Sequence, residues 1–373
     1  MPGAGVTPLP EPTATAGPAD PAATAEAPTT DAAPAPEAPL TTLSPAATNA
    51  LFEVTHTGTK TPLTDLSTAP TRPQEFTFSL LSDRTGFART GVFQLGIEVT
   101  NMFRPDFAVQ IGDSIEGYTE DLEKIVGQWE EFDAITDELD VPLFRVPGNH
   151  DISNPTMREE WLRRHGALYY AFRYRNVLFV VLDTQDPPQS FEDMGMTAEQ
   201  FAGLETRMLT TLEEDPDSFF AAHDDAVDGP MPANFSEEQI RFFEETVEAN
   251  QDVDWTFVLM HMPVWQDREN AAYQRFRAAL GERDFTVFAG HCHNYRREVI
   301  DGRDHIRLSS TGGVWTTSNP EGSWDHVALV QMTPNGPRIA NVVLDGVLGV
   351  DGGTYSPKKH LEEPMVFEVA DKH

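Results

Sequence analysis

The feature that most constrains this chain is a series of apolar, strand-like runs that each end in a side chain able to bind metal ions. The four runs are FAVQIGD, ending at Asp113; VPLFRVP, followed by Gly148-Asn149-His150-Asp151; WTFVLMH, ending at His261; and FTVFA, followed by Gly290-His291-Cys292-His293. Carboxylate, amide and imidazole ligands gathered at strand ends suit a two-metal hydrolytic site. One GNHD motif alone would be weak evidence, whereas four ligand-bearing strand ends in order are strong evidence.

The spacing of apolar residues predicts that strands and helices alternate from residue 76 onward. Strands are expected at 76–83, 106–113, 141–147, 255–261 and 285–289, with helices at 90–103, 119–139, 155–165, 237–250 and 271–283. Further strands are expected at 297–299, 305–309, 327–332 and 338–344, and 169–174 with 177–183 should form a hairpin turning at Arg175-Asn176. Ser236 to Gln239 is a plausible capping box. This alternation favours an α/β sheet with helices on both faces and a site beyond the carboxyl ends of the strands.

The start of the chain lacks the composition of a folded core. Its first 50 residues hold 11 of the 29 prolines and no aromatic residue, Lys or Arg, so they bury too little apolar surface to offset the entropy of ordering. We expect residues 1–74 to form a flexible, acidic, Ala/Pro/Thr-rich tether, 75–350 to form the folded domain, and 351–373 to form a C-terminal tail. Residues 184–235 interrupt the alternation, which predicts a cap or lid over the site, or else a disordered insertion.

The chain is strongly acidic, with a formal net charge of −34, and only five of its 60 acidic residues lie in the first 50 positions. This charge argues against a nucleic-acid backbone or an anionic membrane as a diffuse partner. A phosphate-bearing substrate would have to meet local positive charge, which bound metal ions can supply.

The single cysteine, Cys292, excludes an internal disulfide. The sequence contains no run of about 18 apolar residues, so no transmembrane helix is predicted.

The first residues, MPGAGVTPLPEP, lack the basic and apolar regions of a signal peptide. Either no signal peptide exists or it has been removed. The composition of the predicted tether is similar to that of exported bacterial proteins, so we expect a periplasmic or cell-surface location, with the cytoplasm as the alternative.

Taken together, the motifs resemble the calcineurin-like metallophosphoesterase family, whose pattern runs D-x-H, G-D, G-N-H-[DE], H and G-H-x-H. The matching residues are Asp83, Asp113, Asn149, His150, His261, His291 and His293. The segments SLLSDRTG, QIGDSIEGYT and YYAFRYRNVLFVVLDT further resemble a bacterial branch with D-R-T as its first motif. The resemblance covers about residues 76–345. It implies a central β-sandwich flanked by helices, and a metal-dependent hydrolase of phosphoric esters.

The resemblance also implies a role for each matching residue. Asp113 would bridge two divalent ions, Asn149, His261 and His291 would complete metal two, and Asp83 and His293 would bind metal one. Nitrogen and oxygen ligands fit manganese, iron or zinc. His150 would protonate the leaving oxygen or steady the phosphoryl group, and Asp151 would orient the His150 ring. A hydroxide bridging the metals would attack phosphorus in line.

One position departs from the family pattern. Thr85 stands where the family has the histidine of D-x-H, and threonine is a poor ligand for a transition metal. Metal one therefore keeps three ligands, and either water fills the gap, another side chain such as His223, His305 or His326 substitutes, or the site is weak and exchangeable. Arg84 either clamps the phosphate or is a solvated loop residue.

Several other residues have two interpretations from the sequence. Asp183 either orients a ligand or caps a turn, Gly312-Gly313 either forms a turn or lets substrate approach, and Trp315 either stacks on a substrate or packs. Strand alternation should direct Cys292 away from the metals.

The favoured function is hydrolysis of a phosphomonoester or phosphodiester. The alternatives are a non-catalytic metal- and phosphate-binding module, and a metal-dependent nuclease, which the acidic surface disfavours.

Overall fold

The computed structural model describes residues 41–42, 52–56, 58, 70–71, 75–188, 197, 203, 210–211, 214–215, 233–314 and 322–344. The chain divides into two compact units, Met1–Pro39 and Leu40–His373, and all of these residues belong to the second unit. His223, Trp315, the expected tail and most of the expected cap at 184–235 lie outside the described residues.

The predicted alternation of strands and helices is confirmed, and the observed ends lie within three residues of the predicted ones. The first half contains β4 (Phe76–Leu81), α2 (Val92–Phe103), β5 (Phe107–Gln110), α3 (Leu122–Thr136), β6 (Leu143–Arg145), α4 (Pro155–Arg164), β7 (Tyr170–Tyr174) and β8 (Val177–Val181). The second half contains α8 (Glu237–Ala249), β9 (Trp255–Leu259), the short helix η1 (Val264–Gln266), α9 (Ala271–Leu280), β10 (Phe285–Ala289), β11 (Arg296–Ile300), β12 (Arg303–Arg307), β13 (His326–Thr333) and β14 (Gly336–Val343).

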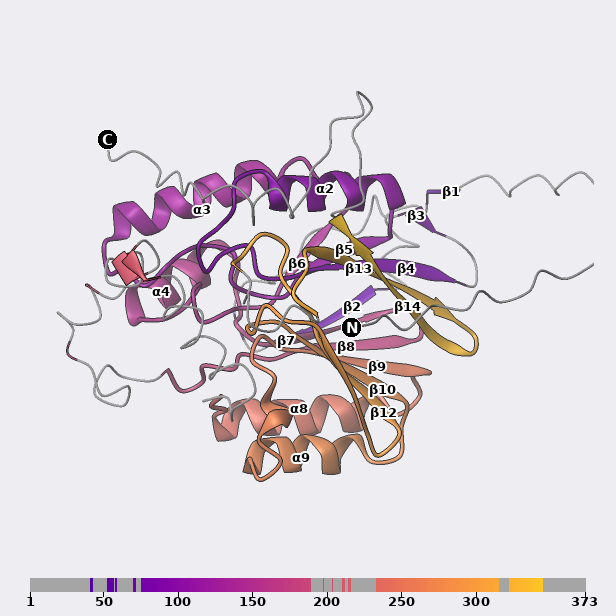
Figure 1. The fold of residues 1–373 in the computed structure, drawn as a ribbon. Helices are drawn as coiled ribbons and strands as arrows, with labels where there is room; N and C mark the ends of the chain where they lie inside the picture. Colours follow the sequence, from indigo (N-terminus) through magenta and orange to yellow (C-terminus); the bar gives the residue numbers. More distant parts are fainter. Residues whose placement is uncertain are drawn as a thin grey trace, which may run out of the picture. The chain divides into compact units, whose positions relative to one another are not determined.

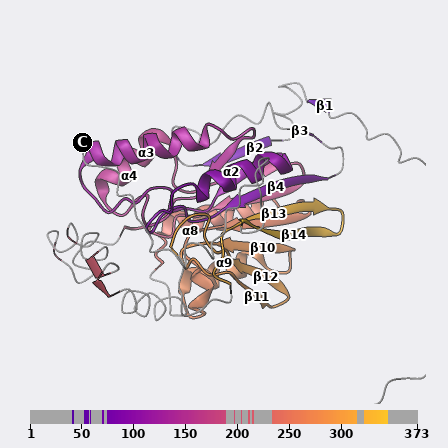
Figure 2. The same cartoon turned by 45° about the horizontal axis from the view of Figure 1, so that its top comes forward.

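The strands form two main sheets that pack face to face (Figures 1 and 2). One sheet has the order β14-β13-β4-β5-β6, and the other has the order β11-β12-β10-β9-β8-β7 with a further strand at its edge. Helices α2, α3 and α4 cover the outer face of the first sheet, and α8 and α9 cover the outer face of the second (Figure 1). The expected β-sandwich flanked by helices is confirmed.

Aromatic rings fill the space between the two sheets. Phe78 of β4 stacks on Phe107 of β5 at 5.4 Å between ring centroids, and Phe172 of β7 stacks on Phe179 of β8 at 4.6 Å. The alternate residues of the same strands pack against the helices, as Val180 does on the α8–α9 side. Because these strands are buried on both faces, their sequences are continuous apolar runs, as in VLFVV and FTVFA.

The expected start of the fold near residue 75 is wrong. Strand β2 (Phe52–His56) extends the second sheet by pairing antiparallel with β7, with residue 52 opposite residue 174 and residue 56 opposite residue 170. Composition excluded a core before residue 50, but an edge strand needs only backbone pairing along one side. Strands β1 (Thr41–Thr42) and β3 (Pro70–Thr71) form a separate two-stranded ladder.

The predicted turn and helix cap are both present. Arg175, between β7 and β8, adopts a left-handed φ of 54°, and Ser236 caps α8 by accepting the backbone N–H of Gln239. The Gln239 side chain does not complete the predicted capping box. It accepts the N–H of Asp183 and donates to the Asp183 carbonyl, so it joins α8 to the end of β8.

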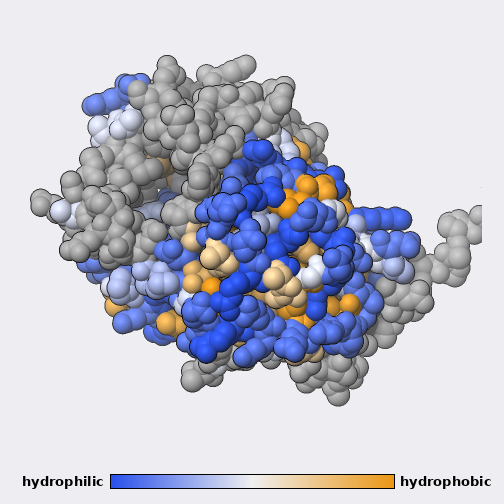
Figure 3. Space-filling model, turned by 90° about the horizontal axis from the view of Figure 1, so that it is seen from below, coloured by the Kyte–Doolittle hydropathy of each residue, from blue (hydrophilic) through white to orange (hydrophobic). Residues whose placement is uncertain are grey.

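The outer surface is polar where the helices α8 and α9 lie. Figure 3 shows this side of the molecule, and hydrophilic residues cover most of what is coloured there. Ion pairs such as those of Arg275 with Glu237 and Glu244 contribute to this surface. Within the described ranges, none of the helices combines the length and the apolar character that a membrane crossing requires.

Candidate metal centre

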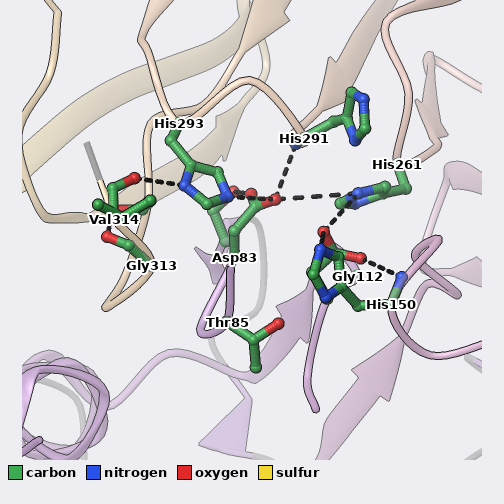
Figure 4. Close-up of polar contacts among 12 residues, drawn as sticks. Asp83, Thr85, Gly112, His150, His261, His291, His293, Gly313 and Val314 are labelled. Atoms are coloured by element: carbon green, nitrogen blue, oxygen red, sulfur yellow. Dashed lines mark hydrogen bonds and ion pairs between the residues drawn. The ribbon is translucent and has the colours of Figure 1, made fainter. Parts of the chain in front are cut away.

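The predicted metal ligands meet at one edge of the sandwich (Figure 4). Each follows the carboxyl end of a parallel strand: Asp83 after β4, Asp113 after β5, Asn149 after β6, His261 after β9, and His291 and His293 after β10. Five of them form two overlapping groups, Asp113–His261–His291 and Asp83–Asp113–His293, whose ligand atoms lie within 4.8 Å of one another. Asp113 belongs to both groups, so its position is that of a bridging carboxylate.

Short distances join the two carboxylates to the imidazoles. Asp113 Oδ2 lies 3.1 Å from His261 Nε2, and Asp83 Oδ1 lies 3.4 Å from His293 Nε2. The other oxygen of Asp113 accepts the backbone N–H of His150 at 3.0 Å, and Asp83 Oδ1 also accepts the backbone N–H of His291 at 2.9 Å. These bonds hold both carboxylates in fixed orientations.

Backbone carbonyls orient two of the histidine rings. His261 Nδ1 donates to the carbonyl of Ile111 at 2.8 Å, and His293 Nδ1 donates to the carbonyl of Val314. Each bond places a ring proton on Nδ1 and points Nε2 at the carboxylates, where a bound metal ion would take its lone pair in place of a proton. This is the arrangement that a metal-binding histidine requires.

Two buried polar atoms of the centre, Asn149 Oδ1 and His291 Nδ1, have no hydrogen-bond partner among the described residues, and a third, His261 Nε2, faces the Asp113 carboxylate at 3.1 Å without forming a hydrogen bond. Buried polar atoms are normally hydrogen-bonded, so a cluster of such atoms needs an explanation. Each carries a lone pair that a cation can accept. The residues present therefore fit metal ions, with Asp113, Asn149, His261 and His291 around one ion and Asp83, Asp113 and His293 around the other.

The electrostatics of the centre also favour cations. Burial raises the pKa of Asp113, but the charges of His261 and His150 outweigh it and bring that pKa below its usual range. Burial likewise opposes ionisation of Asp83, and His293 lowers its pKa. For His261, burial works against protonation, yet Asp113 and Asp83 raise its pKa to about 10. Two ionised carboxylates in a buried site attract positive charge.

Glycines precede the ligands because no side chain fits there. A Cβ on Gly148 would lie 2.2 Å from Asp113 Oδ1, and one on Gly112 would lie 2.4 Å from His261 Nδ1. The ligand loops are themselves tightly turned, since Asp113, His291 and His293 have φ values of 56°, 74° and 50°. Left-handed conformations of non-glycine residues cost energy and concentrate at functional sites.

The hydroxyl group of Thr85 is not directed at the metal ligands. Its Oγ1 donates to the carbonyl of Ile115 at 2.9 Å. His305 and His326 do not replace the family histidine, because His305 contacts Tyr273 and Arg303, and His326 contacts the Ser309 N–H and Asn341. Among the described residues, the group Asp83–Asp113–His293 gains no fourth Asp, Glu, Cys or His ligand.

One interpretation of Arg84, that of a solvated loop residue, needs correction. The guanidinium donates to the carbonyl of Ser114 at 3.0 Å, pairs with Glu131 of α3 and lies over the Phe132 ring. The side chain is therefore largely buried and directed to α3. It is not a solvated loop residue, and a role as a phosphate clamp would require it to leave its pair with Glu131.

The role expected for Asp151 is also wrong. Its carboxylate accepts four backbone N–H groups, those of Asp113, Ser114, Ile115 and Gly148, because two ligand loops turn their N–H groups inward there. The carbonyl of Glu116, at 2.8 Å from Nδ1, orients the His150 ring instead. His150 Nε2 then lies 4.0 Å from Asp113 Oδ2, and the side chain is 20% exposed.

The other residues with two interpretations have structural contacts. Asp183 pairs with Arg158 at 2.9 Å and accepts the N–H of Gln185. Cys292 is buried in the apolar cluster beneath α8 and α9, as expected, although it lies in the loop after β10 and not in a strand. Gly313 lies so close to His293 that a Cβ would be 2.6 Å from the ring, so this glycine permits close packing of the ligand loop.

Sequence reasoning missed three supporting residues. Gln110 bonds the Gly112 N–H and carbonyl, and Tyr118 accepts a hydrogen bond from Asn149. Both lie inside QIGDSIEGYT, so their position beside Asp113 was a usable signal. Arg89 also supports the centre, because it pairs with Asp325 and holds the carbonyl of Gly313.

A β-sandwich between two helical layers thus carries, at its strand ends, two groups of potential metal ligands that share one aspartate. A family model for calcineurin-like phosphoesterases matches residues 97–295, more than half of the chain. The chain belongs to the calcineurin-like phosphoesterase family.

Individual relatives are distant. A bovine (Bos taurus) protein, "Serine/threonine-protein phosphatase CPPED1", is 33% identical over 94 residues, which are 22% of this chain and 28% of that protein. A dimetal phosphatase from Danio rerio has 17% identity and a TM-score of 0.49, covering 72% of this chain and 98% of that one. The purple acid phosphatase PPD1 of yellow lupin (Lupinus luteus) has 12% identity and a TM-score of 0.48, covering 78% of this chain and 54% of that one.

Proposed function

We propose that the protein hydrolyses a phosphomonoester or a phosphodiester with the help of two divalent metal ions. The observation that carries this proposal is the sharing of Asp113 between two buried ligand groups, which would hold two cations side by side. Membership of the calcineurin-like phosphoesterase family supports the reaction class. The bovine relative, whose name denotes a phosphatase, supports it over a short segment.

Metal ions held by the six ligands would place positive charge where a phosphate group meets the strand ends. Bound ions of this kind neutralise phosphate oxygens and lower the pKa of water. Manganese, iron and zinc all suit the nitrogen and oxygen donors present. The protein contributes rigid placement, because Asp83, Asp113, His261 and His293 are each fixed by a second bond to the backbone or to a neighbouring side chain.

His150 is the group best placed to handle the leaving oxygen. Its Nδ1–H is occupied by the Glu116 carbonyl, so Nε2 is the atom that faces the centre beside Asp113. Its side chain is 20% exposed, whereas those of Asp83, Asp113, His261 and His293 are at most 4% exposed, and a substrate can therefore reach it. A positioned acid of this kind contributes about 10²–10⁴-fold to a rate.

Two arginines that bond the ligand loops, Arg84 and Arg89, are already paired. Arg84 is held by Glu131, and Arg89 is held by Asp325 at 2.5 Å. Within the part of the chain that the structure describes, the charge of a phosphate at the strand ends would therefore be met by metal ions and His150. Turnover should depend on metal.

The test measures bound metal and turnover side by side in wild type, Asp113→Asn and His150→Ala. Substrates are p-nitrophenyl phosphate for monoesters and bis(p-nitrophenyl) phosphate for diesters. Asp113→Asn should lose most of its metal and its turnover, because both ion sites lose a ligand. His150→Ala should keep its metal and lose about 10²–10⁴-fold in rate.

A matched control lies on the same strand. Asp106 is a buried carboxylate at the opposite end of β5, where it accepts the Tyr174 hydroxyl and the Thr77 N–H. Asp106→Asn should keep metal and turnover. Near-normal turnover in folded Asp113→Asn would contradict the two-metal proposal. Full metal loading of the wild type without turnover of either ester would favour the binding-module alternative.

A further inference from the structure

The segment Glu116–Tyr118 folds back tightly over the GNH motif. Gly117 has a φ of 61°, and a Cβ there would lie 1.8 Å from the carbonyl oxygen of His150. Tyr118 follows with a φ of 47°, a left-handed conformation that is uncommon for a bulky residue. Strain of this kind persists where surrounding contacts hold it, and here it places the tyrosine against both Asn149 and His150.

The first contact fixes the amide of Asn149. Its Nδ2 donates to the hydroxyl oxygen of Tyr118 at 2.7 Å. An amide offers a metal ligand only at its oxygen, so the side chain is useful in one of its two orientations. With the nitrogen end held by Tyr118, the buried Oδ1 is the end that has no hydrogen-bond partner in the described part of the chain.

The second contact limits the ring of His150. The Tyr118 ring meets it edge-on, with centroids 4.6 Å apart and an angle of 80° between the planes. The Glu116 carbonyl, two residues earlier in the same turn, holds His150 Nδ1. One turn of chain therefore supports the neighbouring ligand and acid at the same time.

We propose that Tyr118 is a positioning residue of the centre, which turns the Asn149 oxygen toward the metal through its hydroxyl and holds the plane of His150 through its ring. This inference rests on the proposed metal centre. It assigns the hydroxyl and the ring to separate tasks, so that removing the hydroxyl alone should weaken metal binding and leave the ring contact in place.

The experiment titrates Mn²⁺ into the metal-stripped full-length protein by calorimetry. Tyr118→Phe should bind Mn²⁺ about 10–100-fold more weakly than wild type, the usual effect of losing a group that orients a ligand. Tyr174→Phe is the matched control, because its buried hydroxyl bonds Asp106 at the far end of the sandwich. That variant should bind Mn²⁺ like the wild type.

A second pair of variants shows whether Tyr118 acts through Asn149. In an Asn149→Ala background, Tyr118→Phe should cause no further loss of Mn²⁺ affinity, since the orientation to be fixed no longer exists. Unchanged affinity in Tyr118→Phe, or an equal loss in both backgrounds, would overturn the inference while leaving the metal centre intact. A wild type that binds no Mn²⁺, zinc or iron would overturn the centre itself. Thermal melts without metal confirm that each variant is folded.

Discussion

Among single residues, Thr85 makes the two halves of the centre unequal. Its hydroxyl is used by the Ile115 carbonyl, so one ion would have four protein ligands and the other three, Asp83, Asp113 and His293. The loop around Thr85 is fixed by backbone bonds to the Asp113 carbonyl. A weaker, exchangeable ion is the expected consequence at the three-ligand site.

This asymmetry predicts the metal content of the purified protein. After dialysis, the wild type should hold fewer than two ions per chain, and Thr85→His should hold more, because an added imidazole supplies a fourth ligand. Thr85→Ser serves as the control, since it keeps a hydroxyl for Ile115 and should match the wild type. Metal analysis by mass spectrometry decides the matter. Two tightly held ions in the wild type would show that the site is already complete.

The ligands of the centre were predictable from the sequence because each directly follows an apolar strand. The roles of Arg84 and Asp151 were not. Arg84 depends on Glu131, which lies 47 positions away on a helix, and Asp151 depends on N–H groups of two different loops. Adjacency in the sequence suggested that Asp151 serves His150, whereas the fold brings the Glu116 carbonyl to that ring.

Strands buried on both faces were the easiest elements to predict, and the edge strand was the hardest. The run VLFVV of β8 indicates a strand by composition alone. Strand β2 is identified by its pairing with β7, more than 100 residues later, and no local signal reports such a partner. The boundary of the folded region was misplaced for this reason.

Two truncations should therefore differ in stability. Removal of residues 1–39 leaves β2 in place and should shift the melting temperature little, as the proline-rich composition suggests. Removal of residues 1–74 deletes β2 and its ladder to β7, where each lost hydrogen bond costs roughly 0.5–1.5 kcal/mol. Thermal melts of both proteins should show a drop of several degrees for the longer truncation only. Equal melting temperatures would mean that β2 adds no stability.

For the molecule as a whole, buried neutral histidines should limit stability in acid. His305 is buried beside Trp265, Tyr273 and Phe285. Burial, reinforced by the charges of Arg277 and Arg268 and opposed by Asp301, lowers its pKa from the usual 6.5 to about 4. His326 is likewise buried, with its pKa lowered to about 4. In the unfolded chain, both rings therefore become protonated at a higher pH than they do in the folded protein.

The stability contributed by these two neutral histidines should fall between about pH 6.5 and pH 4, because the unfolded chain protonates both rings there and the folded state does not. The loss from His305 alone amounts to about 3 kcal/mol at the lower limit. Urea unfolding of metal-free protein at several pH values, compared between wild type and His305→Gln, isolates this contribution. The variant should lose less stability over this range than the wild type does. Parallel curves would rule out the role assigned to His305.

Asp113 has a thermodynamic consequence for any ion that the centre takes up. Since the same carboxylate belongs to both ligand groups, an ion entering one group changes the charge and the oxygen geometry offered to the other. Linkage makes this influence reciprocal, so each ion alters the affinity for its neighbour by the same factor. The two dissociation constants are therefore expected to be conditional quantities, each defined only for a stated occupancy of the adjoining position.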